Sequence, residues 1–355
     1  MKKILRQPLF IKIFHWEYWP FNVVYCPIYI YWFWLGIKAR AVFFFSTSNP
    51  SIKNGGFLLE SKKQIYDLIP PQYYPPTLLF KAGTNRNDIL NELNRTQMRF
   101  PLIAKPDIGM RGLSVEKVHC AAELMHYATG SKVDFLIQEF ISYENEAGIF
   151  YYRYPNEKKG HISGIVGKEF LTVTGDGMAT VEQLLQQDPR FILQLPVLRR
   201  THTEILQQVL GKDETHLLVP YGNHSRGAKF MDISYLIDEV LTETIDSVCQ
   251  KVPGFYFGRM DVRYNTWEEL RRGRNFSIIE LNGAGSEPTH IYDPKHSVFY
   301  AWREIIRHLG ILYRISKQNH KLLHIPYMKF SMGMQMLKEN TAYVKLISNQ
   351  FSKPA

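Results

Sequence analysis

Two short segments near the C-terminus decide the fold: GRMDVR, residues 258–263, and IIELNG, residues 278–283. Alternate side chains of a strand point to the same face, so each segment would present its charged residues on one side. The link between them, residues 265–275, is polar and charged, as expected of a surface loop. We therefore predict that the two segments are the antiparallel strands of one hairpin.

The charged residues of this hairpin are of the types that hold a nucleotide and magnesium. Arg259, Asp261 and Arg263 would share one face of the first strand, and Glu280 and Asn282 one face of the second. Hard oxygen ligands suit Mg²⁺, which usually takes one or two carboxylates together with phosphate oxygens of a substrate. An arginine beside them would neutralise charge on a transferring phosphoryl group.

The composition is that of a folded protein with an excess of positive charge. The 355 residues are 45% hydrophobic and 21% charged, and the net charge is +10, which favours phosphates, nucleic acid or anionic lipid as partners. Only net charge supports nucleic-acid binding, so we expect none. Cys26, Cys120 and Cys249 are too far apart for a disulfide framework or a zinc site, which fits a reducing, cytoplasmic location.

The N-terminus contains twenty residues, 18–37, without a formal charge and rich in Tyr and Trp. Tyr and Trp prefer the headgroup level of a bilayer, and Pro20 and Pro27 are expected to interrupt a helix. Cations precede and follow the stretch: Lys2, Lys3, Arg6, Lys12, Lys38 and Arg40. This composition predicts an anchor at an anionic membrane surface, on the inner face of the cell membrane. The alternatives are an aromatic core helix, a homodimer interface and a true membrane span.

A lysine before a glycine-containing turn is a candidate phosphate site. Lys105 ends an apolar strand and is followed by a turn that contains Gly109, Arg111 and Gly112. Such a turn can bring backbone N–H groups to phosphate oxygens, while Lys105 and Arg111 add positive charge. The alternative for the same segment is an ordinary hairpin.

Three other polar segments are candidates for nucleotide or substrate contacts. Glu139 and Glu146 could accept from an adenine amino group or ribose hydroxyls, or could be solvated glutamates at strand ends. Asn223 and Arg226 lie in a glycine-flanked loop that suits an anion, with a polar surface loop as the alternative. The glycines that follow Asn282, beginning with Gly283, could expose N–H groups to a developing oxyanion.

Taken in order, these segments resemble the ATP-grasp superfamily of carboxylate–amine ligases over residues 61–314. PLIAKP (101–106), QEFI (138–141) with Glu146, GRMD (258–261) and ELN (280–282) are similar to segments of D-alanine–D-alanine ligase. The stretches at 173–184 and 223–227 are closer to cyanophycin synthetase and the fused glutathione synthetases. The resemblance implies an α+β, ATP-grasp fold, and the irregular alternation of predicted strands and helices also favours α+β. Among these elements are a short buried strand at residues 41–46 and helices over residues 197–210 and 233–249.

The resemblance also implies a role for each candidate. Lys105 would bind ATP phosphates, with Lys62 and Lys168 as further cations, Glu139 would contact adenine, and Glu146 would hold the ribose. Asp261, Glu280 and Asn282 would ligate two Mg²⁺ ions, for which Mn²⁺ could substitute. Arg259 would face the γ-phosphate, and Gly283 with its neighbours would stabilise the oxyanion.

We therefore expect an ATP-dependent ligase that activates a small-molecule or lipid-linked carboxylate as an acyl phosphate, releases ADP and joins the carboxylate to an amine. An ATP-grasp kinase and a nucleotide-binding protein without turnover are the alternatives. The expected regions are a membrane-surface segment (1–40), a short α/β region (41–82), an ATP-grasp domain (83–320, with a lid at about 100–142) and a C-terminal tail (321–355).

Overall fold

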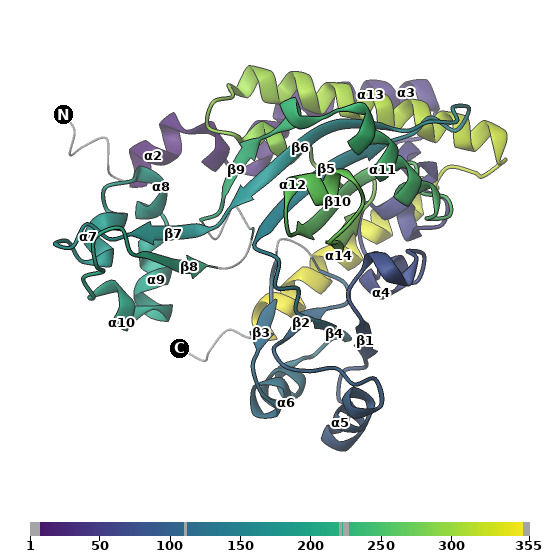
Figure 1. The fold of residues 1–355 in the computed structure, drawn as a ribbon. Coiled ribbons are helices and arrows are strands. Elements are labelled where there is room, and N and C mark those ends of the chain that lie inside the picture. Colours follow the sequence, from purple (N-terminus) through teal and green to yellow (C-terminus); the bar gives the residue numbers. More distant parts are fainter. Residues whose placement is uncertain (1–7, 110–111, 220–221, 223–226, 351–355) are drawn as a thin grey trace.

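A computed structural model describes residues 8–109, 112–219, 222 and 227–350 of the chain. Its centre is a five-stranded antiparallel sheet in the order β11-β10-β5-β6-β9, with helices on both faces (Figure 1). The predicted α+β class is confirmed. The strands of this large sheet are β5 (Asn145–Tyr152), β6 (His161–Glu169), β9 (Lys229–Asp232), β10 (Phe257–Tyr264) and β11 (Phe276–Asn282).

A second, smaller sheet has the order β1-β4-β2-β3 and lies at the bottom of Figure 1 with two helices against it. Its core contains Leu102, Tyr127 and Phe135, all fully buried. The elements of this unit are β1 (Thr77–Phe80), α5 (Arg86–Arg95), β2 (Leu102–Pro106), β3 (Glu116–Val118), α6 (Ala121–Gly130) and β4 (Phe135–Glu139).

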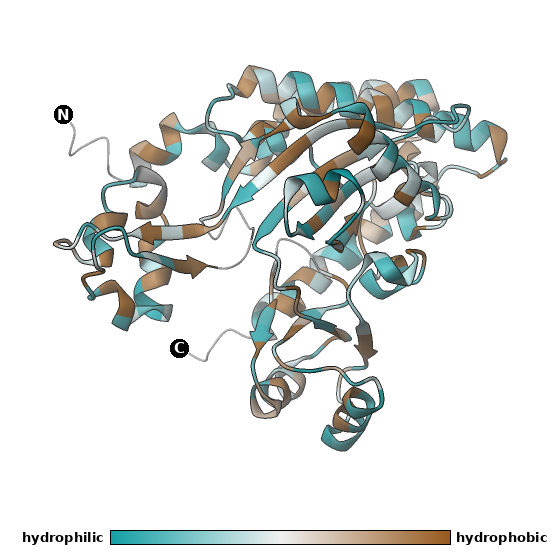
Figure 2. Cartoon of the chain, viewed as in Figure 1, coloured by the Kyte–Doolittle hydropathy of each residue, from teal (hydrophilic) through white to brown (hydrophobic). Residues whose placement is uncertain are grey.

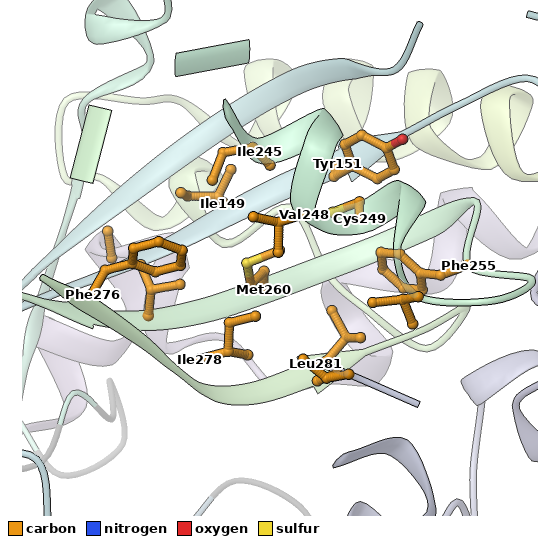
Figure 3. Packing of buried hydrophobic residues seen from close by; sticks show 14 of the residues in the cluster. Ile149, Tyr151, Ile245, Val248, Cys249, Phe255, Met260, Phe276, Ile278 and Leu281 are labelled. Atoms are coloured by element: carbon orange, nitrogen blue, oxygen red, sulfur yellow. The ribbon is translucent and has the colours of Figure 1, made fainter. Parts of the chain in front are cut away.

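One face of the large sheet is covered by α11 (Glu239–Gln250) and α12 (Trp267–Arg271). Figure 3 shows Ile245, Val248 and Cys249 of α11 pointing at the apolar side chains of the strands, and all three are buried. The predicted start of this helix at Ile233 is wrong. The helix begins after Asp238, whose side chain accepts a hydrogen bond from the Leu241 N–H and so caps the first turn.

The other face carries both ends of the chain, as α3 (Phe21–Ala39), α13 (Val298–Leu322) and α14 (Phe330–Gln350). The expectation that Pro27 interrupts a helix is wrong, because α3 continues through it. Pro20 does precede the helix, and packing of α3 against α13 offsets the hydrogen bond that Pro27 cannot donate. None of the helices in the described part of the chain combines the length and the apolar character that crossing a membrane requires.

The short strand expected at residues 41–46 is absent, and a 3-10 helix, η2 (Phe44–Thr47), stands there instead. Phe44 and Phe45 are fully buried in a cluster with Leu35 of α3 and Leu312 of α13. An apolar run of this length suits either a strand or a helical turn, and packing between the two helices selects the turn.

A two-stranded sheet, β7 (Leu171–Thr174) with β8 (Thr215–Val219), extends from the large sheet and carries four short helices (Figure 1). The single helix predicted over 197–210 is divided at His202, whose backbone is not helical. The helices are α7 (Val181–Leu185), α8 (Pro189–Ile192), α9 (Leu195–Thr201) and α10 (Thr203–Leu206).

Hydrophobic residues run along the central strands, and hydrophilic residues prevail on outer helices such as α5 and α12 (Figure 2). The remaining short elements connect these parts. They are α2 (Pro8–Phe14), η1 (Trp16–Tyr18), η3 (Lys53–Gly56), α4 (Lys62–Tyr66), η4 (Pro71–Tyr73), η6 (Ser234–Leu236) and η7 (Thr289–Tyr292).

Candidate active site

The predicted hairpin is present, because β10 and β11 pair antiparallel. In the register Arg259 lies opposite Asn282, and Asp261 lies opposite Glu280. A bulge follows Asp261, so the register shifts by one residue after the functional pairs. The two carboxylates are thus direct cross-strand neighbours, as the alternation of charged residues predicted.

Asp261 is held by two cations. The Arg259 guanidinium donates through Nε to Oδ1 at 2.8 Å and through Nη2 to Oδ2 at 3.1 Å, a bidentate pair. Lys168 Nζ lies 3.5 Å from Oδ2. Burial opposes the charge on Arg259, but Asp261 outweighs that effect and leaves the guanidinium pKa raised.

Glu280 is paired with Lys62, whose Nζ lies 3.1 Å from Oε1 and also donates to the Gly109 carbonyl at 2.8 Å. Burial would raise the pKa of Glu280. The positive charges of Lys62, Lys105 and Arg259 nevertheless hold that pKa at about 2. Glu280 is therefore anionic throughout the physiological range.

Lys105 is buried and is held by neutral oxygens. Its Nζ donates to Gln138 Oε1 at 2.8 Å, to Tyr66 Oη at 2.9 Å and to the Ile279 carbonyl at 3.3 Å. Burial, with a contribution from the nearby Lys62, lowers the Lys105 pKa to about 7 against the attraction of Glu280. An anionic ligand beside Lys105 would favour the charged ammonium.

Glu146 faces the same centre from β5 and is buried. Lys168 Nζ donates to its Oε1 at 2.7 Å, and Arg263 Nε lies 3.1 Å from its Oε2. Lys168 therefore joins Glu146 to Asp261. The predicted ribose contact of Glu146 stays a prediction, as does the adenine contact of Glu139 at the end of β4.

These side chains line one cavity of about 1400 Å³. Residues of both sheets contribute to its wall. The predicted site residues that line it are Lys62, Lys105, Gly109, Gly112, Glu139, Glu146, Lys168, Arg259, Asp261, Glu280 and Asn282. The predictions for Arg111, Asn223 and Arg226 fall outside the described residues.

Two of the N–H groups that were predicted to face an oxyanion, those of Ala284 and Gly285, do not do so. The Ala284 N–H donates to the Gly55 carbonyl and the Gly285 N–H to the Gly56 carbonyl, each at 2.9 Å, so neither is available to a substrate. Gly283 itself packs closely against another loop, and its own contact with an oxyanion stays a prediction. A Cβ there would lie 2.5 Å from the Gly55 carbonyl oxygen and 2.8 Å from Gly56 Cα, so only glycine fits this contact between loops.

The donor set suits magnesium. Asp261 and Glu280 offer carboxylate oxygens, and Asn282 offers its side-chain amide oxygen. Asn282 Nδ2 is buried without a hydrogen-bond partner among the described residues, and a buried donor in this state indicates an acceptor, such as a phosphate oxygen, at this position. Within the described residues there is no group of three or more His, Cys, Asp and Glu that could hold a metal. Two carboxylates with an amide therefore match an ion that also takes phosphate oxygens.

Sequence reasoning missed several polar residues at this site. Tyr66 and Gln138 position Lys105. Glu60 lines the cavity and has a buried carboxylate oxygen without a partner among the described residues. Burial raises its pKa, and Glu280 adds to that effect. Glu287 accepts from Tyr25 Oη of α3 at 2.6 Å. In the sequence, these residues could have been found only by their closeness to predicted site residues, since Gln138 precedes Glu139 and Glu60 lies two residues before Lys62.

No family model and no curated protein matches the chain. Among solved structures it is similar to a bifunctional glutathione synthetase from Pasteurella multocida, at 14% identity and a TM-score of 0.42 over 74% of this chain and 37% of that one. It is also similar to the VanG D-Ala:D-Ser ligase from Enterococcus faecalis, at 15% identity and a TM-score of 0.41 over 71% of this chain and 61% of that one. A third similar structure is D-alanine–D-alanine ligase from Bacillus anthracis, at 12% identity and a TM-score of 0.40 over 74% of this chain and 68% of that one.

These enzymes are ligases of the two groups that the sequence motifs resemble. The chain spans 37% of the length of the glutathione synthetase and 61% of the length of the D-Ala:D-Ser ligase. At such identities the likeness concerns the fold, and the function is argued from the side chains of the site.

Proposed function

We propose that the chain is an ATP- and magnesium-dependent ligase that joins a carboxylate to an amine. One observation carries the proposal. Lys62, Lys168 and Arg259 converge on the cross-strand carboxylates Asp261 and Glu280, in a cavity lined from two antiparallel sheets. Buried cations at this density suit a triphosphate, and oxygen ligands in their midst suit the ion that accompanies it.

In this proposal the nucleotide phosphates lie against Lys62 and Lys105. Both lysines line the cavity and both are buried or partly buried, so their charges act with little screening by solvent. Lys62 also holds the Gly109 carbonyl and so links the glycine turn to the floor of the site. Glu139 and Glu146, which line the same cavity, are the candidates for adenine and ribose.

The carboxylate substrate would attack the γ-phosphorus, so that the bond to the ADP leaving group breaks and an acyl phosphate forms. Arg259 is placed to stabilise the charge on the transferring group. Asp261, Glu280 and Asn282 would hold Mg²⁺, which neutralises phosphate charge when bound. The amine then attacks the acyl carbon, inorganic phosphate leaves, and the nitrogen loses a proton. Glu60, whose pKa is raised, is suited to accept that proton.

A test of this chemistry uses Mg–ATP, panels of carboxylates and amines, and hydroxylamine as a trap. The acyl-phosphate route predicts ADP together with a hydroxamate that forms only when the carboxylate is present. A phosphorylated acceptor without hydroxamate would instead identify a kinase. Release of AMP and pyrophosphate would exclude the proposed route.

We also propose that the protein acts at a membrane surface. The support is the outer face of α3, where Ile30 is 75% and Ile37 is 76% exposed, although both are large aliphatic residues. Lys12 precedes the helix and Lys38 lies in its last turn. An apolar helix face flanked by cations is typical of an interfacial contact with anionic lipid.

We expect the protein to sediment with anionic liposomes, and the double substitution of Ile30 and Ile37 by serine to lower the bound fraction at least severalfold. Ile306, on α13, is 38% exposed, and its substitution by serine is the control. Equal binding of the double variant and the unmodified protein would contradict a membrane contact through α3.

A further inference from the structure

The cavity that contains the charged site continues into an apolar chamber. Its total volume of about 1400 Å³ exceeds the roughly 300–1,000 Å³ that is usual for pockets of drug-sized ligands. Besides the charged site, the lining contains many apolar residues of α3, α13, α14 and the η3–α4 connection. We call this part the apolar chamber and define it by Ile28, Trp32, Phe57, Leu312, Leu337 and Val344.

Helix α14 turns a mainly apolar face toward the chamber, interrupted by Asn340. Phe330, Met334, Leu337, Val344 and Ile347 line the cavity together with Asn340, and their spacing of three or four residues places them on one face of the helix. Met334 and Leu337 remain 37% exposed. The helix therefore presents apolar side chains to a space that the protein itself does not fill.

Helix α3 joins the chamber to the reacting end of the cavity. Ile28 and Trp32 lie along the chamber, and Tyr25, one turn earlier, donates through Oη to Glu287 at 2.6 Å. The Glu287 carbonyl accepts from Arg259 Nη1 at 3.3 Å. The apolar wall thus reaches the guanidinium that we place at the γ-phosphate, so one elongated molecule can contact both.

The imidazole of His308 is held neutral, whereas Lys12 and Glu17, near the start of α3, are the charged residues that line the cavity on the N-terminal side. His308 lines the cavity, its Nδ1 lies 2.8 Å from the Glu304 carbonyl, and its Nε2 lies 2.9 Å from Ser163 Oγ. Burial lowers the His308 pKa to about 3, so the imidazole is uncharged at neutral pH. This end of the cavity suits hydrocarbon and disfavours a second charged group.

We infer that one of the two ligation substrates carries a long hydrocarbon chain, which lies in the apolar chamber between α3, α13 and α14. Its polar head reaches Arg259 and Glu287. The identity of the polar head group rests on the proposed function. The presence of a hydrocarbon chain rests on the cavity alone. It makes the protein a ligase of an amphiphile rather than of two small polar metabolites.

The test measures equilibrium binding of two homologous series to the full chain, by calorimetry and below micelle formation. One series runs from butanoate to dodecanoate, and the other from butylamine to dodecylamine. Burial of each added methylene should lower Kd by up to about fourfold until the chamber is filled. The series in which this occurs identifies the substrate that carries the chain.

A matched pair of variants on α14 distinguishes binding in the apolar chamber from nonspecific hydrophobic binding to the protein surface. Leu337→Trp places a larger side chain in the chamber, and Leu346→Trp makes the same change at a position that is 41% exposed and outside the cavity wall. Leu337→Trp should raise Kd for the C12 ligand at least about tenfold and leave the C4 ligand within twofold. Leu346→Trp should change neither.

Kd values that do not fall with chain length in either series would overturn the inference, as would equal effects of Leu337→Trp and Leu346→Trp. The chain-length series uses the unmodified protein, so it decides the matter even if a variant fails to fold. Binding requires no turnover. If Kd falls with chain length but no hydroxamate forms, the ligase proposal is rejected and the apolar chamber is retained. If hydroxamate forms but Kd does not fall with chain length, the ligase proposal is retained and the long-chain substrate is rejected.

Discussion

Replacement of Glu280 by glutamine is expected to lower ATP turnover by at least about a hundredfold, because it removes a charged ligand and leaves the shape of the side chain almost unchanged. The Glu280 pKa of about 2 means that the wild-type group is a full anion at any working pH. The amide cannot balance Lys62, whose Nζ is 3.1 Å away, and is a poorer ligand for Mg²⁺. ADP release and hydroxamate formation measure the loss.

The control for this substitution is Glu268→Gln on α12. Glu268 also forms ion pairs, with Arg271 and Arg272, but on an exposed surface, where such pairs contribute little. Glu268→Gln should retain full activity. Thermal unfolding of both variants shows whether lost activity reflects lost folding. A folded Glu280→Gln protein with wild-type turnover would remove Glu280 from the metal site.

The hairpin and its charged face could be predicted from the sequence because both depend on local pattern. A period of two, with a polar link between two strands, fixes which side chains share a face. The structure places Asp261 opposite Glu280 and Arg259 opposite Asn282, as this pattern requires. Lys105 could be found for the same reason, since it is the last residue but one of an apolar strand of the smaller sheet.

The partners of these residues could not be predicted in the same way. Gln138 meets Lys105 through the pairing of β4 with β2, two strands that are more than thirty residues apart in the sequence, and Tyr66 meets it only when α4 packs beside this sheet. The wrong assignment of the Ala284 and Gly285 N–H groups to an oxyanion has a similar origin. A glycine-rich segment shows that the backbone comes close to something, but tertiary structure decides whether that is a substrate or, as here, the loop at Gly55 and Gly56.

The role of the chain ends was the least predictable part. The tail expected over 321–355 contains α14, which reaches toward the smaller sheet in Figure 1, and its Tyr343 packs in one cluster with Ile108. The aromatic N-terminal segment indicated a membrane contact, but its pattern could not show that one face of α3 would line the cavity of the site. The contribution of α3 and α14 to the site becomes visible only in the folded structure, where both helices line the cavity.

Replacement of Lys105 by methionine is expected to weaken Mg–ATP binding about 10- to 100-fold at pH 6.5, the loss of a charged hydrogen bond to phosphate. It should also remove a pH dependence. Burial lowers the Lys105 pKa to about 7, and phosphate would raise it again in the complex. Above about pH 7, binding must therefore take up a proton, and the wild-type Kd should rise by up to about tenfold per pH unit.

The lowered Lys105 pKa also determines how the free energy of unfolding changes with pH. In the unfolded chain the lysine keeps its proton to a pKa near 10.5, whereas the folded, nucleotide-free protein loses it above about pH 7. Between these values unfolding takes up a proton, so Lys105 makes the free energy of unfolding rise with pH across that window. The methionine variant should lack this rise. Denaturant unfolding at pH 6.5, 8 and 9.5 measures it.

Lys81→Met is the control for both measurements, because Lys81 lies on the outside of the smaller sheet and pairs with Asp134 at the surface. The phosphates of ATP themselves titrate near pH 6, and that effect is common to every variant, so it cancels in the comparison. If wild type, Lys105→Met and Lys81→Met show the same pH profile of Kd, the triphosphate does not lie against Lys105. The nucleotide phosphates would then have to lie along Lys168 and Arg263, at the other end of the cation cluster. Both of these side chains already form ion pairs with Glu146.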